Sequence, residues 1–121
     1  MTPGSEPASR PIHIWTELQI GPGNEDAFRA VGRRMTELVG AFEPGMLDYH
    51  WYFSDDGSIC HVYERVADEA ALSAHGDGEA VRVGIPQLLA LGRFSRFEVH
   101  GDLSVATAEY MRGVGATVYR P

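Results

Sequence analysis

The sequence predicts an α+β fold in which one antiparallel sheet carries its helices on a single face. Three observations lead to this class. Apolar and polar residues alternate from Ile12 to Ile20, and a period of two is typical of a strand. Between Asn24 and Phe42 apolar residues recur every three or four positions, which is typical of an amphipathic helix. Ser54-Asp55-Asp56-Gly57 separates two apolar runs and predicts a β-hairpin.

The length of 121 residues fits one domain. Residues 1–11 are rich in proline, glycine and serine, so we expect a flexible N-terminal tail there. The domain is expected at residues 12–121, including a C-terminal helical extension. No run of about 18 apolar residues could span a membrane, and no basic segment followed by an apolar one marks a secretory signal. These features predict a cytoplasmic protein without a membrane partner.

A helix is predicted directly after the first strand. Gly21-Pro22-Gly23 ends the strand, and Asn24 is a suitable helix cap. Glu25 and Asp26 then lie near the positive end of the helix dipole. The apolar face of this helix comprises Phe28, Val31, Met35, Leu38, Val39 and Phe42. Glu43-Pro44-Gly45 ends the helix, because proline cannot continue it.

Two further strands are predicted at Met46–Phe53 and Ser58–Val66, on either side of the hairpin turn. If Asp56-Gly57 is a two-residue turn, position 52 pairs with 61 and position 50 with 63. That register would put His50 and His61 on one face of the sheet, whereas a three-residue turn would put them on opposite faces.

The region after the hairpin is predicted to be helical. Asp68 can cap a helix that reaches His75, and a second helical stretch is expected over Glu79–Leu91. Breaks or ends in these stretches are expected at Gly76, Gly78, Gly84, Pro86 and Gly92.

The C-terminal part adds a fourth strand at Phe94–His100 and a short helix that Ser104 can cap and Gly113 ends. Ala116–Tyr119 either forms an edge strand or lies along the surface. The order strand, helix, strand, strand, helix, strand is the split βαβ arrangement, ferredoxin-like in topology. Right-handed crossovers would place both main helices on the same face of the sheet.

Both faces of the predicted sheet carry large apolar or aromatic side chains. In the second strand Leu47, Tyr49, Trp51 and Phe53 oppose Met46, His50 and Tyr52. In the third strand Cys60, Val62 and Val66 oppose Ile59, His61 and Tyr63. Helices can cover only one face, and a solvated face should be polar. We therefore expect a homodimer joined through the uncovered faces of the sheets.

The charge balance argues against nucleic acid as a partner. Ten basic residues stand against seventeen acidic ones, a net charge of -7, whereas an electrostatic grip on phosphates needs clustered positive charge. The single cysteine, Cys60, allows neither an intrachain disulfide nor a thiolate metal cluster. It lies in an apolar strand pattern and is expected to be a buried, inert thiol rather than a reactive one.

An ordered set of short segments resembles the antibiotic biosynthesis monooxygenase family of dimeric α/β barrels. These segments are Pro22-Gly23 leading into a long helix, Glu43-Pro44-Gly45 with Tyr49 four residues on, Tyr63-Glu64-Arg65, and then Asp68, Ala71, Leu72, Ala74 and His75. The resemblance spans about Ile12 to His100. It implies a two-subunit barrel with a pocket in each subunit between sheet and helices. It also implies, for some members, oxidation of polycyclic phenols by dioxygen without flavin, haem or metal.

His75 and Glu64 are the candidate catalytic residues, because they match the helix histidine and the strand glutamate of the family. Such chemistry needs a proton acceptor, hydrogen bonds that hold the resulting anion, and an apolar cavity that excludes water. His75 could be a base or a hydrogen-bond donor, since histidine titrates near neutrality. The alternative is a structural histidine bonded to Glu64 or to a backbone carbonyl. Glu64 could likewise be a structural partner of His75 or Tyr49.

The candidate substrate-binding residues are Tyr49, Trp51, Trp15, Tyr63 and His61. Aromatic side chains can stack on a planar ligand and orient it with their polar ends. Tyr49 and Trp51 share a face of their strand and are the preferred pair. Packing in the core or in a dimer interface would explain most of these aromatic residues equally well.

No metal or other cofactor is expected. A metal site at His50 and His61 would need a third ligand such as His13 or Glu17, and no close-spaced ligand motif supports one. By the resemblance, haem-degrading relatives carry tryptophan where His75 stands and an axial histidine where this sequence has Ile85. Haem degradation is therefore not expected.

The sequence thus favours a cofactor-independent monooxygenase acting on a phenolic or quinol-type aromatic substrate. One alternative is a non-catalytic module that binds a small aromatic metabolite. Another is a barrel relative that catalyses isomerisation by proton transfer. Because one fold hosts many functions, the alternatives are separated only by the chemistry of the site.

Overall fold

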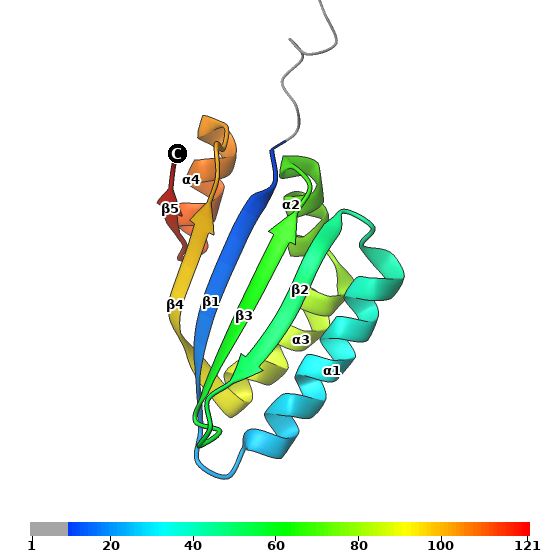
Figure 1. Ribbon diagram of the computed structural model, residues 1–121, viewed down its shortest axis with the longest axis vertical. Coiled ribbons are helices and arrows are strands. Elements are labelled where there is room, and N and C mark those ends of the chain that lie inside the picture. The colour runs from blue at the N-terminus through cyan, green and yellow to red at the C-terminus, as the bar shows by residue number, and fades with distance from the viewer. Residues whose placement is uncertain (1–9) are drawn as a thin grey trace, which may run out of the picture.

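Nine helices and strands build the described part of the chain (Figure 1). They are β1 (Ile12–Ile20), α1 (Glu25–Phe42), β2 (Met46–Phe53), β3 (Ile59–Val66), α2 (Glu69–Gly76), α3 (Glu79–Leu91), β4 (Gly92–His100), α4 (Val105–Gly113) and β5 (Thr117–Tyr119). The structure, a computed structural model, describes residues 10–121, so the expected N-terminal tail lies outside the described residues apart from Arg10 and Pro11. Within this part no helix is long and apolar enough to cross a membrane.

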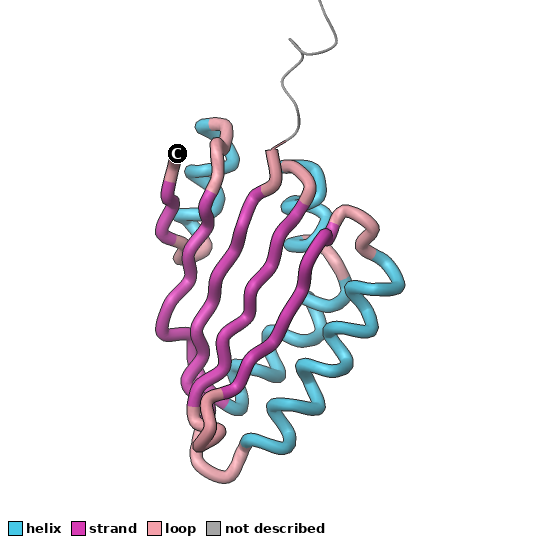
Figure 2. Tube along the Cα trace, viewed as in Figure 1, coloured by secondary structure: helices cyan, strands magenta, loops and turns pink. Residues whose placement is uncertain are grey.

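The five strands form one sheet in the order β2-β3-β1-β4-β5. Figures 1 and 2 show the helices on one face of this sheet. The first four strands pair antiparallel and give the ferredoxin-like βαββαβ topology, as predicted. Of the two alternatives for Ala116–Tyr119 the edge strand forms, as β5, which pairs in parallel with β4. Parallel pairing requires a crossover, and α4 provides it.

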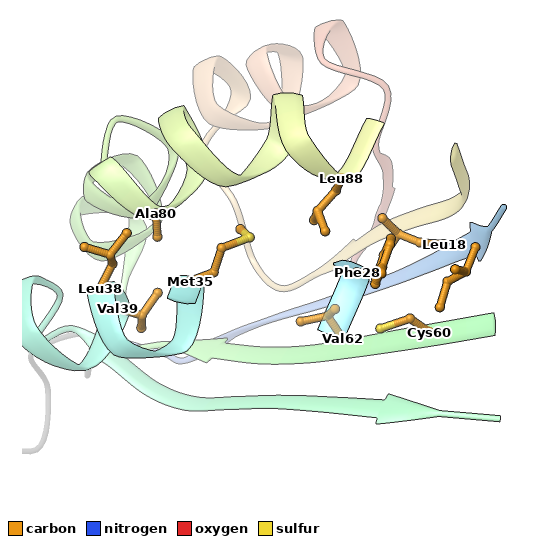
Figure 3. Packing of buried hydrophobic residues seen from close by; sticks show 10 residues of the cluster. Leu18, Phe28, Met35, Leu38, Val39, Cys60, Val62, Ala80 and Leu88 are labelled. Carbon is orange, nitrogen blue, oxygen red and sulfur yellow. The ribbon is translucent and has the colours of Figure 1, made fainter. Parts of the chain in front are cut away.

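The main core lies between the sheet and helices α1 and α3 (Figure 3). Phe28 of α1 and Cys60 of β3 are completely buried in it, with Leu18 and Leu88 nearly so. Burial raises the pKa of the Cys60 thiol to about 12. The thiol therefore stays protonated at neutral pH and packs as an apolar group, as the sequence predicts.

Helix α3 runs unbroken from Glu79 to Leu91, so the expected break near Gly84 and Pro86 does not occur. Pro86 removes one backbone donor, but packing against neighbouring elements supplies most of a helix's stability. Gly84 has a packing role, since a Cβ at this position would collide with the Met35 side chain of α1. The missing side chain at Gly84 thus leaves room for Met35 between the two helices.

The alternation predicted for the second strand fails at its first residues. The register of β2 against β3 shifts between Met46 and Asp48, which is the effect of a β-bulge. As a result Met46 packs against the core and Leu47 is exposed. Further along, the register agrees with the two-residue alternative, with His50 opposite Tyr63 and position 52 opposite 61.

Two of the three predicted helix caps form through their side chains, and the third does not. The side chains of Asp68 and Ser104 each accept a hydrogen bond from a backbone N–H in the first turn of α2 and α4. Asn24 occupies the cap position of α1, but its side chain donates to the carbonyl oxygen of Leu91 at 3.0 Å instead. This bond fixes the start of α1 to the end of α3.

We expect Phe28→Ala to lower the free energy of unfolding by about 3–5 kcal/mol, because it leaves a cavity in a closed core. Phe42→Ala on the same helix should change it by less than about 0.5 kcal/mol, since Phe42 is 67% exposed. Urea unfolding at one protein concentration checks both values. Equal losses in the two variants would contradict the described packing of α1.

Candidate active site

A cavity of about 680 Å³ lies between the sheet and the helices. Strands β1 to β4 line one side of it, and α2, α3 and α4 line the other. Its volume falls within the range of roughly 300–1,000 Å³ usual for small-molecule sites. The lining is mainly apolar, and three of its polar side chains, Tyr49, Glu64 and His75, come from β2, β3 and α2.

His75 is held between two carboxylates. Its Nδ1 lies 2.6 Å from Oε1 of Glu43 and donates a hydrogen bond to it. Its Nε2 lies 2.9 Å from Oε1 of Glu64. That second contact is an ion pair whose ring N–H is poorly aligned, so Oε1 of Glu64 makes no hydrogen bond of good geometry to the described residues. Each of the three residues is only 9% exposed.

The local fold brings the three residues together from distant positions. Glu43 is the C-terminal cap residue of α1, and the following Pro44-Gly45 turns the chain into β2. His75 lies in the last turn of α2, and Glu64 points from β3 to the helix-covered face. Space for the Glu43 carboxylate depends on Gly78, where a Cβ would lie 2.9 Å from Oε2 of Glu43.

The charge state of His75 follows from these partners. Burial alone would lower the pKa of its imidazole, but the hydrogen bond to Glu43 and the contact with Glu64 outweigh burial and raise it to about 10. His75 is therefore an imidazolium at neutral pH and already holds the proton that a general base would have to accept. The geometry favours a hydrogen-bond donor and charge partner over a base at this position.

Tyr49 and Trp51 line the cavity beside this group. The Tyr49 ring lies edge-on to His75 and to Trp51, with centroid distances of 6.0 Å and 6.1 Å. Burial, and next the Glu64 carboxylate, raise the pKa of the Tyr49 phenol, so it stays protonated. The indole Nε1 of Trp51 is buried without a hydrogen-bond partner among residues 10–121.

The other predicted binding residues do not line this cavity. Trp15, Tyr63 and His61 lie on the opposite face of the sheet, which the helices leave uncovered. There Trp15 stacks on Tyr63 at 5.8 Å between ring centroids, with planes 8° apart, and Arg96 lies over the Trp15 ring at 4.3 Å. The structure therefore separates the predicted set into a cavity pair, Tyr49 and Trp51, and a group on the uncovered face.

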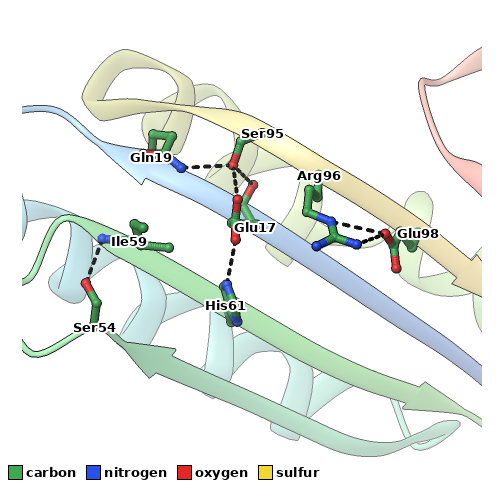
Figure 4. A network of polar contacts seen from close by, with 8 residues as sticks. All are labelled: Glu17, Gln19, Ser54, Ile59, His61, Ser95, Arg96 and Glu98. Atoms are coloured by element: carbon green, nitrogen blue, oxygen red, sulfur yellow. Dashed lines mark hydrogen bonds and ion pairs between the residues drawn. The ribbon is translucent and has the colours of Figure 1, made fainter.

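A polar network crosses the same uncovered face (Figure 4). Glu17 of β1 lies 2.8 Å from Nε2 of His61 and accepts a hydrogen bond of 2.8 Å from the Ser95 hydroxyl. These bonds, that of Ser95 first, hold the pKa of the Glu17 carboxyl below its usual range. Nowhere within residues 10–121 do three histidine, cysteine or acidic side chains gather in an arrangement suited to a metal ion.

Sequence reasoning missed several residues of the site. At Glu43 the sequence predicts only a helix-ending motif, and nothing in the local pattern shows that its side chain turns inward. Phe94 and Phe97 both line the cavity although they are three residues apart on a strand. The register shift of β4 against β1 leaves Ser95 without a paired residue, and such a bulge turns both rings to one face.

Fold and cavity together define a ferredoxin-like domain with a buried acid–histidine group in a mainly apolar pocket. The family model for antibiotic biosynthesis monooxygenases matches residues 11–86. The chain therefore belongs to the antibiotic biosynthesis monooxygenase family, as the resemblance of its sequence segments implies. No curated protein matches the sequence.

Solved structures show the same fold. MupZ from Pseudomonas fluorescens is 21% identical with a TM-score of 0.77, over 93% of this chain and 91% of its own. Rv0793 from Mycobacterium tuberculosis is 24% identical with a TM-score of 0.69, over 80% of this chain and 99% of its own. A conserved protein from Methanosarcina mazei Go1 is 20% identical with a TM-score of 0.65, over 76% of this chain and 90% of its own.

The raised pKa of His75 predicts how stability depends on pH. The imidazole changes from an ordinary value of 6.5 to about 10 on folding, so between these values the folded state holds a proton that the unfolded state lacks. The stabilisation of the folded state by the charged His75 is complete below about pH 6.5 and is lost as the pH rises towards 10. We expect stability to fall across this window by at most about 1.4 kcal/mol per pH unit from this group.

Glu43→Gln should make this dependence shallower, because it removes one of the two charges that hold the proton on His75. Glu37→Gln, which changes an exposed carboxylate on the same helix, should leave it unchanged. Urea unfolding of the three proteins at several pH values between 6.5 and 10 measures the slopes. A wild-type slope equal to that of Glu43→Gln would contradict the proposed charge state.

Proposed function

We propose that this protein is a cofactor-independent monooxygenase that oxidises a phenolic or quinol-type aromatic substrate with dioxygen. The observation that carries the proposal is the buried Glu43–His75–Glu64 group at the wall of a mainly apolar cavity. Family membership supports the reaction class, and the charge arrangement supports the first chemical step.

That first step is removal of the phenolic proton by Glu64. His75 is already protonated and Tyr49 stays protonated, so among these three cavity-lining groups Glu64 is the free acceptor. The group carries two negative charges and one positive charge before the step and becomes neutral on accepting the proton. The net charge in the cavity stays the same, because the negative charge moves from Glu64 to the substrate oxygen. The imidazolium of His75 and the phenol of Tyr49 then offer positive charge and a donor to the substrate anion.

The substrate anion supplies the electrons for the remaining steps. It transfers an electron to dioxygen, and the two radicals combine at a ring carbon. Glu64 returns its proton to the peroxide that results. Loss of the hydrogen on the ring carbon then breaks the O–O bond, one oxygen atom stays in the quinone product, and the other leaves as hydroxide, which takes up the released proton to give water. An apolar cavity protects such intermediates from side reactions with water.

Glu64→Gln should lower the turnover number at least 100-fold, on the order expected for loss of a general base. Oxygen uptake by chelator-treated protein without added flavin, tested on anthrones, naphthols and hydroquinones, provides the measurement. Glu109→Gln is the matched control, because Glu109 is exposed on α4 and does not line the cavity.

Two results would count against this function. One is a folded Glu64→Gln variant with full turnover, which would remove the proposed acceptor. The other is a wild-type protein that takes up no oxygen although a panel compound raises its melting temperature. That second result would favour the module that only binds an aromatic metabolite.

We further propose that two copies associate through the uncovered faces of their sheets. Tyr52 and Tyr63 are exposed there, while Nε1 of Trp15 is buried without a partner among the described residues. Large aromatic groups on a face that no helix covers favour a self-complementary contact, and two-fold dimers are the commonest arrangement of this kind.

Light scattering at micromolar concentration should give twice the chain mass of 13.3 kDa. Tyr63→Glu should shift the mass to that of the monomer, because a like charge would be placed in both halves of the contact. Phe42→Glu, at an exposed position of α1 on the other side of the molecule, should leave the dimer intact. A monomeric wild-type mass would overturn the proposed association.

A further inference from the structure

The C-terminal segment forms one wall of the cavity although it lies outside residues 11–86, which match the family. The residues of α4 that line the cavity are Ala106, Thr107, Tyr110 and Met111, followed by Val114 at its C-terminal cap. Spacings of three and four residues place them on one face of the helix. Helix α4 thus presents a continuous side to the space above β1 and β4.

This wall is held in place by contacts that do not depend on a ligand. The backbone N–H and the hydroxyl of Ser104 donate to the two carboxylate oxygens of Glu69, at 3.1 Å and 2.7 Å, which ties the start of α4 to α2. Ala108 is completely buried on the inner side of α4. After the helix, β5 pairs with β4. The wall is therefore preformed.

The part of α4 that faces the cavity exposes apolar side chains to solvent. Tyr110 is 62% exposed and Val114 is 51% exposed, and both border the cavity. The cavity volume of about 680 Å³ is several times the roughly 150 Å³ that suffices for a single benzene ring. A one-ring ligand at Glu64 would leave these side chains uncovered.

The order of the strands in the sheet shows on which side of Glu64 the α4 wall lies. Glu64 on β3 pairs with Ile14 on β1, which in turn pairs with Val99 on β4. Two strand spacings amount to about 10 Å, and α4 lies beyond them with Phe94 and Phe97 of β4 lining the floor. A ligand whose hydroxyl reaches Glu64 therefore extends its other end towards α4.

We propose that Tyr110 and Val114 determine substrate specificity by binding the apolar part of the substrate that extends beyond the ring at Glu64. The assignment rests on the proposed function for the position of the hydroxyl group. It adds a subsite built by residues outside the family match, and it selects hydroxyarenes that carry an apolar extension over those that consist of one ring.

Anaerobic calorimetry with 4-ethylphenol and 4-octylphenol tests the subsite, because the two probes share the hydroxyarene and differ only in chain length. The wild-type protein should bind the octyl compound at least tenfold more tightly. Combined Tyr110→Ser and Val114→Asn substitutions should reduce this ratio below threefold and change 4-ethylphenol binding less than twofold. Val105→Asn is the control, since Val105 is exposed on the same helix but does not border the cavity; its ratio should equal that of the wild type.

An unchanged ratio in the double variant would overturn the subsite, as would failure of the wild-type protein to bind either phenol. An unchanged ratio together with a lower mass in light scattering would mean that a second copy contacts this part of α4 instead. These outcomes are separate from the fate of the proposed function, which depends on oxygen uptake by the wild type and by Glu64→Gln. A protein could retain the subsite and fail that test, or pass it without the subsite.

Discussion

The contact of His75 with two buried carboxylates is the constraint on which the rest of the site depends. Three ionisable groups that are nine-tenths buried lose their hydration, and this loss is tolerable only because opposite charges lie within 2.6 Å and 2.9 Å. Their positions are therefore coupled. The end of α1, the last turn of α2 and the middle of β3 must meet at one point, and removal of the His75 charge would leave two buried carboxylates without a counter-charge.

This coupling explains local features that otherwise have no common cause. Pro44-Gly45 must turn sharply so that Glu43 can point inward, and a Cβ on Gly45 would collide with Ala71 of α2. Gly78 must lack a side chain for the same reason, because the Glu43 carboxylate occupies that space. Backbone positions with no contact to a ligand are thus restricted by the charged group.

The general fold could be predicted because its signals are local. Alternation in β1, the apolar face of α1 and the Asp56-Gly57 turn each reflect the periodicity of a single element. The failures share a different origin. The β2 bulge that exposes Leu47 and the unbroken course of α3 through Pro86 depend on neighbouring elements, which no window of sequence contains.

The same distinction applies to the site: residues with local signals could be predicted, and residues placed by the meeting of separate elements could not. Glu64 and His75 could be named from short segments that resemble the family, and Tyr49 and Trp51 followed from alternation on one strand. Glu43 could not be recognised, because its inward direction is set by the meeting of three elements. Aromatic residue types alone do not show whether a side chain lines the cavity. Only the face of the sheet on which each residue lies excludes Trp15, Tyr63 and His61 from it.

The division of the cavity between two parts of the chain suggests how selectivity and chemistry can vary independently. Glu43, Tyr49, Glu64 and His75 all lie within residues 11–86, the part that matches the family. The other end of the cavity is lined by residues of β4 and α4, which follow that part. Helix α4 is anchored through Ser104 and Glu69 and through its own buried side, so substitutions at its cavity-facing positions need not disturb the charged group. The charged end of the cavity is constrained by buried electrostatics. The apolar end is constrained mainly by shape, and a change of shape costs much less energy than the loss of a buried charge partner.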